Sequence, residues 1–126
     1  MRAALFRSFH HAFSGLAEAW RTQRNLRLHL LAAVLAVGLG LALGMALVEL
    51  AILCLTIGLV LSAELFNTAV ETLMDLVHPD HHPLAKAAKD VAAGAVLVTA
   101  GTAVLVGALL YGPHLVRAAA ALGFLP

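Results

Sequence analysis

Two runs of this sequence, residues 28–48 and 91–115, carry no acidic, lysine or arginine side chain. A third run, residues 50–63, is equally apolar and continues into a segment containing carboxylates. A helix needs about 20 apolar residues to cross a bilayer, and a water-soluble fold of 126 residues has no room to bury so much apolar surface. Apolar residues make up 62% of the chain and charged residues 12%. This excludes a soluble enzyme, a disordered tail and a collagen-like fibre.

We therefore predict an all-α integral membrane protein with an amphipathic N-terminal surface helix and three transmembrane helices in a single domain, residues 1–126. The surface helix is expected at about 3–24 and the transmembrane helices at about 28–48, 50–76 and 86–112. The surface helix has an apolar face whose members recur at helical spacing within an arc of about 80°. These are Phe6, Phe9, Phe13, Leu16 and Trp20. Basic amphipathic helices of this kind lie in the headgroup layer.

The distribution of basic residues predicts the orientation. Five of the eight lysines and arginines precede the first span, two lie in the connector at 76–90, and only Arg117 follows the third span. The positive-inside rule places the N-terminus and this connector in the cytoplasm. The net charge of +1 gives no general attraction to nucleic acid, and the single Cys54 excludes an intrachain disulfide framework.

The second span carries the polar residues that chemistry requires. Glu64, Asn67, Glu71 and Asp75 fall within about 80° of one another on a helix. An acidic residue inside a span costs roughly 2.5–3.5 kcal/mol on insertion scales and usually marks a functional site. A bound cation would relieve the repulsion along this face, and Mg²⁺ suits one or two carboxylates with waters and phosphate oxygens. A hydrated interfacial stripe or a hydrogen-bonded packing network is the alternative.

The connector between the second and third spans contains two prolines and is predicted to be a loop. Lys86, Lys89 and Asp90 follow on one face of the next helix. Lysine donors beside an acidic, metal-binding face are suited to a polyphosphate, although lysines at a membrane edge also snorkel without further function. The three loop histidines are only a weak indication of a zinc site, because two of them are adjacent and no thiolate accompanies them.

Two segments resemble the signatures of the prokaryotic diacylglycerol kinase family. They are the run from Ala63 to Glu71, continuing to Asp75, and the run from Ala85 to Ala95. The stretches at 25–29 and 82–86 are closer to the Gram-positive branch, which is known for phosphorylating undecaprenol. The resemblance covers nearly the whole chain, including the basic leader.

The resemblance implies a lipid kinase of the bacterial inner membrane. It would be a homotrimer with active sites between protomers, transferring the γ-phosphoryl of MgATP to a lipid hydroxyl, either undecaprenol or diacylglycerol. By motif position, Glu64 is the expected catalytic base and Glu71 a Mg²⁺ ligand. The expected nucleotide and cofactor contacts are His11, Gln23, Asn67, Glu71, Asp80, His81, His82, Lys89 and Asp90. Gln23 stands where the family has a second metal-binding Glu, and His11 where it has an aromatic residue.

Two other classes of function are compatible with a small helical bundle. A channel subunit, holin or assembly factor would use the acidic face as a cation path, but such a path needs polar positions along its full length. Residues 50–61 provide only Thr56 and Gly58. A nucleotide-sensing membrane protein would keep the fold without catalysis. Lipid-dependent phosphate transfer distinguishes a kinase from both.

Overall fold

The computed structural model describes residues 2–80 and 82–124, and all regular structure in those ranges is helical. The helices are α1 (Arg2–Thr22), α2 (Arg24–Ala42), α3 (Leu47–Val77) and α4 (Pro83–Ala121). The last three are long and apolar enough to cross a membrane. The predicted all-helical class, with three candidate spans after an N-terminal helix, is confirmed.

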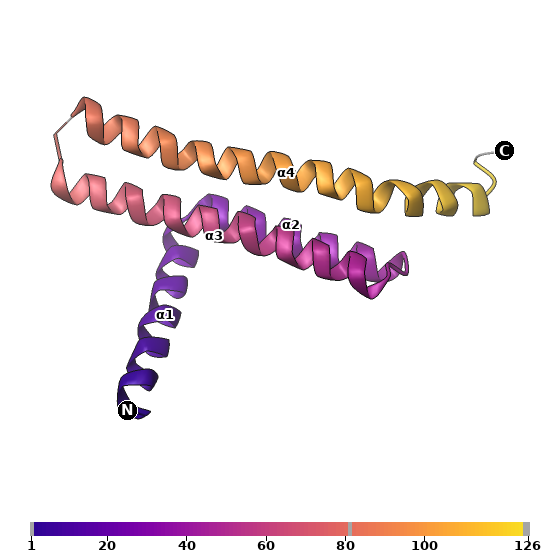
Figure 1. The fold of residues 1–126 in the computed structure, drawn as a ribbon, viewed down its shortest axis with the longest axis horizontal. Coiled ribbons are helices and arrows are strands. Elements are labelled where there is room, and N and C mark those ends of the chain that lie inside the picture. The colour runs from indigo at the N-terminus through magenta and orange to yellow at the C-terminus, as the bar shows by residue number, and fades with distance from the viewer. Residues whose placement is uncertain (1, 81, 125–126) are drawn as a thin grey trace.

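The central helix of the bundle is α3, which packs against α4 along its length and against α2 (Figure 1). A tight turn joins α2 to α3, and it requires Gly44, whose φ of 69° is rarely open to other residues. Gly40 permits the close packing at this turn, because a Cβ there would lie 2.9 Å from the Met45 sulfur. The turn therefore ends α2 at Ala42, before the apolar run itself ends.

The first helix leaves the bundle at a steep angle (Figure 1). The change of direction occurs at Gln23, which has extended backbone angles between two helices. The apolar face of α1 is exposed, with Phe6 at 78% and Phe13 at 67% of full accessibility. Such a face is costly in water and favourable in the headgroup layer, so α1 has the geometry of a surface helix beside spans that cross the bilayer.

The lengths of the helices set the level of each residue along the bundle. At about 1.5 Å per residue, α2 spans about 28 Å and α3 about 46 Å, against a hydrocarbon core of about 30 Å. Because α2 runs back along α3 from their shared turn, the α1–α2 junction lies level with about residues 64–67 of α3. Beyond that level, the carboxyl end of α3 and the amino end of α4 extend together toward their loop (Figure 1).

Few side chains are buried within one chain. The buried apolar residues among those described are Ala19, Leu26, Met45, Leu53, Val60 and Ala85. Large side chains such as Val34, Leu97 and Leu109 are more than two-thirds exposed along the spans. Exposed apolar area on this scale exceeds what a soluble monomer tolerates. Lipid or other copies of the chain must therefore cover these faces.

Candidate active site

The most buried acidic side chain in the described structure is Glu64, in the middle of α3, with 2% exposure. Its Oε2 atom has no hydrogen-bond partner, and neither does Oδ1 of Asn67, one turn further along. Buried polar atoms are nearly always paired in folded proteins. Two orphaned acceptors on adjacent turns therefore indicate a place where a donor from outside this chain is received.

Asn67 also orients the next carboxylate of the predicted face. Its Nδ2 donates to Oε1 of Glu71 at 3.0 Å, and Glu71 is half-buried. Since α3 is uninterrupted from Leu47 to Val77, the helical phase places Glu64, Asn67 and Glu71 on one face as predicted. The face runs from the level of the α1–α2 junction toward the α3–α4 loop.

The last carboxylate of this face pairs with α4. Oδ1 of Asp75 accepts a hydrogen bond from Nζ of Lys89 at 2.5 Å, and both groups are substantially exposed. Exposed pairs of this kind contribute about 0–1 kcal/mol. The Lys89 ammonium group can therefore leave Asp75 and bind an incoming anion at a small cost in free energy. The sequence placed Asp75 on the acidic face but gave no sign of this pairing, which depends on how α4 lies against α3.

A pocket of about 510 Å³ lies at this end of the bundle, between the ends of α3 and α4 and their loop. Its lining residues are Met74, Asp75, His78, Pro79, Asp80, His82, Pro83, Ala85, Lys86 and Lys89. The pocket combines lysine donors, imidazoles and carboxylates. That combination suits a phosphate-bearing ligand, since the cations share its charge.

Local structure explains two of the pocket residues. His82 begins α4, and its Nδ1 accepts the backbone N–H of Leu84 at 3.2 Å, while Pro83 occupies the first helical position. The His82 ring stacks on His78 with centroids 4.7 Å apart, which joins the two ends of the loop. The predicted site residue His81 lies outside the described residues.

The remaining residues expected at the site are not among those that line this pocket. Asp90 is exposed and pairs with Lys86 at 2.5 Å, one turn earlier on α4. Gln23 is half-buried at the α1–α2 junction. His11 lies on α1, where its ring stacks on His10 at 6.0 Å, and α1 projects from the side of the bundle at a steep angle (Figure 1).

The described residues do not form a multi-ligand metal centre. No group of three or more histidine, cysteine, aspartate or glutamate side chains in residues 2–80 and 82–124 is placed to hold a metal ion. This gives the zinc alternative no support there. A site that completes its coordination with waters and substrate phosphates, as Mg²⁺ sites commonly do, needs only one or two carboxylates.

A second groove, of about 660 Å³, lies between the faces of α3 and α4 nearer the middle of the bundle. It is lined mainly by alanine, valine and Phe66, and Asn67 is its one polar lining residue. An apolar groove that includes Asn67 in its lining can hold a lipid chain or a neighbouring helix beside that residue.

Comparison with known proteins identifies the family. The prokaryotic diacylglycerol kinase family model matches residues 10–111. An undecaprenol kinase from Bacillus subtilis is 46% identical over 110 residues, covering 87% of this chain and 89% of that protein. A diacylglycerol kinase from Synechocystis is 45% identical over 109 residues, covering 86% of this chain and 62% of that protein. The Escherichia coli K12 diacylglycerol kinase is 29% identical over 104 residues, 82% of this chain and 85% of that protein.

The extent of these matches confirms the resemblance seen in the sequence, and with it the expectation of a lipid-phosphorylating enzyme rather than a channel or assembly subunit. The chain belongs to the prokaryotic diacylglycerol kinase family and is a multi-pass membrane lipid kinase.

Proposed function

We propose that this kinase transfers the γ-phosphoryl group of MgATP to undecaprenol at the cytoplasmic face of the membrane. The choice of acceptor is supported by 46% identity to an undecaprenol kinase along 89% of that protein. The choice of face is supported by the basic leader and by Lys86 and Lys89 at the loop end. Diacylglycerol is the alternative acceptor, supported by the relatives that carry that name.

The orphaned Oε2 of Glu64 is the observation that carries the proposed mechanism. Glu64 lies level with the surface helix, where the hydroxyl of a membrane lipid meets the headgroup layer. We assign Glu64 as the general base, which accepts the hydroxyl proton while the lipid oxygen forms its bond to the γ-phosphorus. The bond from that phosphorus to the β–γ bridging oxygen breaks, and ADP leaves with the electron pair.

The loop-end pocket is the proposed site for the triphosphate. Lys89, Asp80 and His82 lie together there, and we propose that they bind the nucleotide, with Lys89 exchanging Asp75 for a phosphate oxygen. His81 and Asp90 are proposed nucleotide contacts by their motif positions alone. Phosphoryl transfer depends mainly on alignment and on neutralising charge. Because Lys89 already lies beside the acidic face, its ammonium group can both align the triphosphate and neutralise its charge.

Glu71 and Gln23 are the proposed Mg²⁺ ligands. The donor set fits a Mg²⁺ that keeps several waters, because one oriented carboxylate is present and the amide oxygen of Gln23 replaces a second. When bound, the metal ion supplies charge compensation to the transferring phosphoryl group. Asn67 holds the Glu71 carboxylate in place and keeps its own Oδ1 free.

We also propose that the working enzyme is a homotrimer. The extensive exposed apolar faces and the open groove between α3 and α4 leave room for neighbouring helices. Within one chain α1 leaves the bundle at its junction with α2 and not at the loop end (Figure 1), so we propose that α1 of a neighbouring copy brings His11 to the nucleotide. Copies arranged around an axis would complete one site at each interface.

The decisive experiment is lipid-dependent transfer of labelled phosphate from MgATP by the purified protein in bilayer nanodiscs. Separate samples contain undecaprenol, diacylglycerol or no added acceptor. We expect transfer to both lipids over the acceptor-free background, with the larger kcat/KM for undecaprenol. A larger value for diacylglycerol would contradict the acceptor assignment, and the absence of lipid-dependent transfer would contradict the mechanism.

A further inference from the structure

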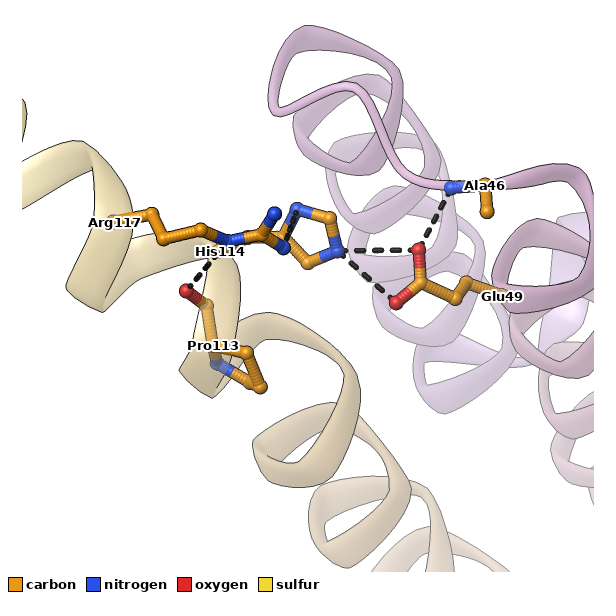
Figure 2. A network of polar contacts seen from close by, with 5 residues as sticks. All are labelled: Ala46, Glu49, Pro113, His114 and Arg117. Carbon is orange, nitrogen blue, oxygen red and sulfur yellow. Dashed lines mark hydrogen bonds and ion pairs between the residues drawn. The ribbon is translucent and has the colours of Figure 1, made fainter.

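A second polar network lies where α4 passes the α2–α3 turn, at the opposite end of the bundle from the α3–α4 loop. Figure 2 shows this network from close by. His114 of α4 is 8% exposed, and its Nε2 lies 3.1 Å from both carboxylate oxygens of Glu49 in the first turn of α3. Oε2 of Glu49 also accepts the backbone N–H of Ala46, at 2.7 Å, at the end of the α2–α3 turn. Arg117 lies on the other side of the ring, with Nη2 3.3 Å from Nδ1 of His114 and Nε donating to the Pro113 carbonyl.

The partners of the ring determine where its proton lies. A guanidinium group only donates hydrogen bonds, so Nδ1 of His114 must be the acceptor toward Arg117. The proton of the neutral ring is then on Nε2, from which it is donated to Glu49 (Figure 2). In this state the network contains one negative and one positive charge, separated by a neutral imidazole.

A second proton on the ring breaks one of its two contacts and strengthens the other. Protonation places a hydrogen on Nδ1, which removes the acceptor and sets two cations against each other at His114 and Arg117. The contact with Glu49 becomes an ion pair with the same donor. Since the Arg117 side chain is long and the residue is exposed, it can swing away, whereas the buried ring cannot.

Few titratable or charged groups face His114, so no nearby group other than Glu49 offsets the positive charge that the ring gains on protonation. Glu49 faces it from α3 and Arg117 from α4. Residues 39–46, at the end of α2 and in the turn, and residues 118–124 of the tail contain no titratable side chain. Tyr111, one turn earlier on α4, has its hydroxyl engaged with the Ala36 carbonyl at 2.6 Å.

We propose that Glu49, His114 and Arg117 form a proton-operated latch. His114 ties α4 to the first turn of α3 through Glu49 in both protonation states of the ring, and protonation releases only the Arg117 side chain from the ring. With the N-terminus in the cytoplasm, the latch faces the other side of the membrane and responds to the pH there. The contacts of the latch do not depend on the residue roles proposed for catalysis, and the side of the membrane that it faces rests on the proposed orientation.

The test compares Arg117→Met in two backgrounds, the natural chain and His114→Gln, in nanodiscs at pH about 8 and about 5, the range over which imidazoles titrate. Glutamine can donate to Glu49 and accept from Arg117 but does not titrate. We expect Arg117→Met to lower the unfolding midpoint at the higher pH and to leave it unchanged or raise it at the lower pH. In the His114→Gln background the effect should be the same at both pH values.

Arg24→Met, which removes an arginine at the start of α2, is the matched control and should show no such change with pH. A pH-independent effect of Arg117→Met in the natural chain would overturn the proposal, and so would a pH dependence that persists with His114→Gln. A second measurement needs no variant. The protection of the Arg117 Nε–H against exchange with water, measured by NMR and corrected for the pH dependence of the intrinsic exchange rate, should be smaller at the lower pH. Protection that is the same at both pH values would also refute the latch.

Discussion

Replacing Glu64 with glutamine separates the proposed catalytic role of this residue from its structural role. The substitution keeps the size and shape of the side chain but removes its ability to accept a proton. In the structure Oε2 of Glu64 has no partner at 2% exposure, so the carboxylate is not holding neighbouring residues in place through that atom. We expect Glu64→Gln to fold normally and to lose phosphoryl transfer.

The magnitude of each effect follows from the environment. General base catalysis contributes about 10²–10⁴-fold, which corresponds to about 2.7–5.4 kcal/mol at about 1.36 kcal/mol per tenfold change. The free energy of unfolding of Glu64→Gln should be almost unchanged or slightly higher than that of the natural chain. A buried unpaired acceptor costs about 1–3 kcal/mol, and the new amide nitrogen puts a donor one turn from Asn67 Oδ1, which also lacks a partner.

The assay measures transfer of labelled phosphate to lipid in nanodiscs, together with the unfolding midpoint of the same preparation. Glu18→Gln, the same chemical change at an exposed position of α1, is the matched control and should retain activity. Undiminished transfer by Glu64→Gln would refute the role of base. A loss of activity that is matched by a loss of stability would refute the interpretation that the orphaned oxygen is reserved for chemistry.

Other substitutions test the metal site and the packing of the bundle. Glu71→Gln should raise the Mg²⁺ concentration needed for half-maximal transfer, since a charged ligand is lost, and an unchanged Mg²⁺ titration would remove Glu71 from the metal site. Gln23→Glu should lower that concentration by restoring charge attraction; no shift, or a shift the other way, would show that position 23 does not bind metal. Tyr111→Phe removes the hydrogen bond to Ala36 and should lower the free energy of unfolding in detergent by about 0.5–1.5 kcal/mol. The Mg²⁺ titration of transfer should not change. An unchanged unfolding midpoint would contradict the contribution assigned to this bond.

Much of the fold follows from patterns within single helices. The apolar runs predict three spans, the aromatic face predicts a surface helix, and the phase of Glu64, Asn67 and Glu71 predicts a shared polar face. Each of these depends only on the spacing of residues along one helix. The roles assigned to the site residues stay predictions, because they rest on motif positions.

Features that depend on contacts between helices were not predictable from such spacing. The pairing of Lys89 with Asp75 needs the register of α4 on α3, and the loop-end pocket needs both helices to continue past the level of α2. Glu49 and His114 were missed for the same reason, since they are 65 positions apart and meet only through the antiparallel packing of α3 and α4. The signal in the sequence for this pair is a lone Glu and a lone His, each in an otherwise apolar segment.

The steep angle between α1 and the bundle (Figure 1) has a consequence for how deep the catalytic residues lie in the membrane. With its aromatic face resting on the acyl chains, as proposed, this helix would fix how far the protein sinks into the leaflet, and its junction with α2 lies level with Glu64 of α3. Under the proposed role of Glu64 as the base, an alcohol would be selected by whether its oxygen rises to that height, while the tail below could vary in length and branching. Diacylglycerol and undecaprenol, the two acceptors considered above, would then both satisfy the same criterion.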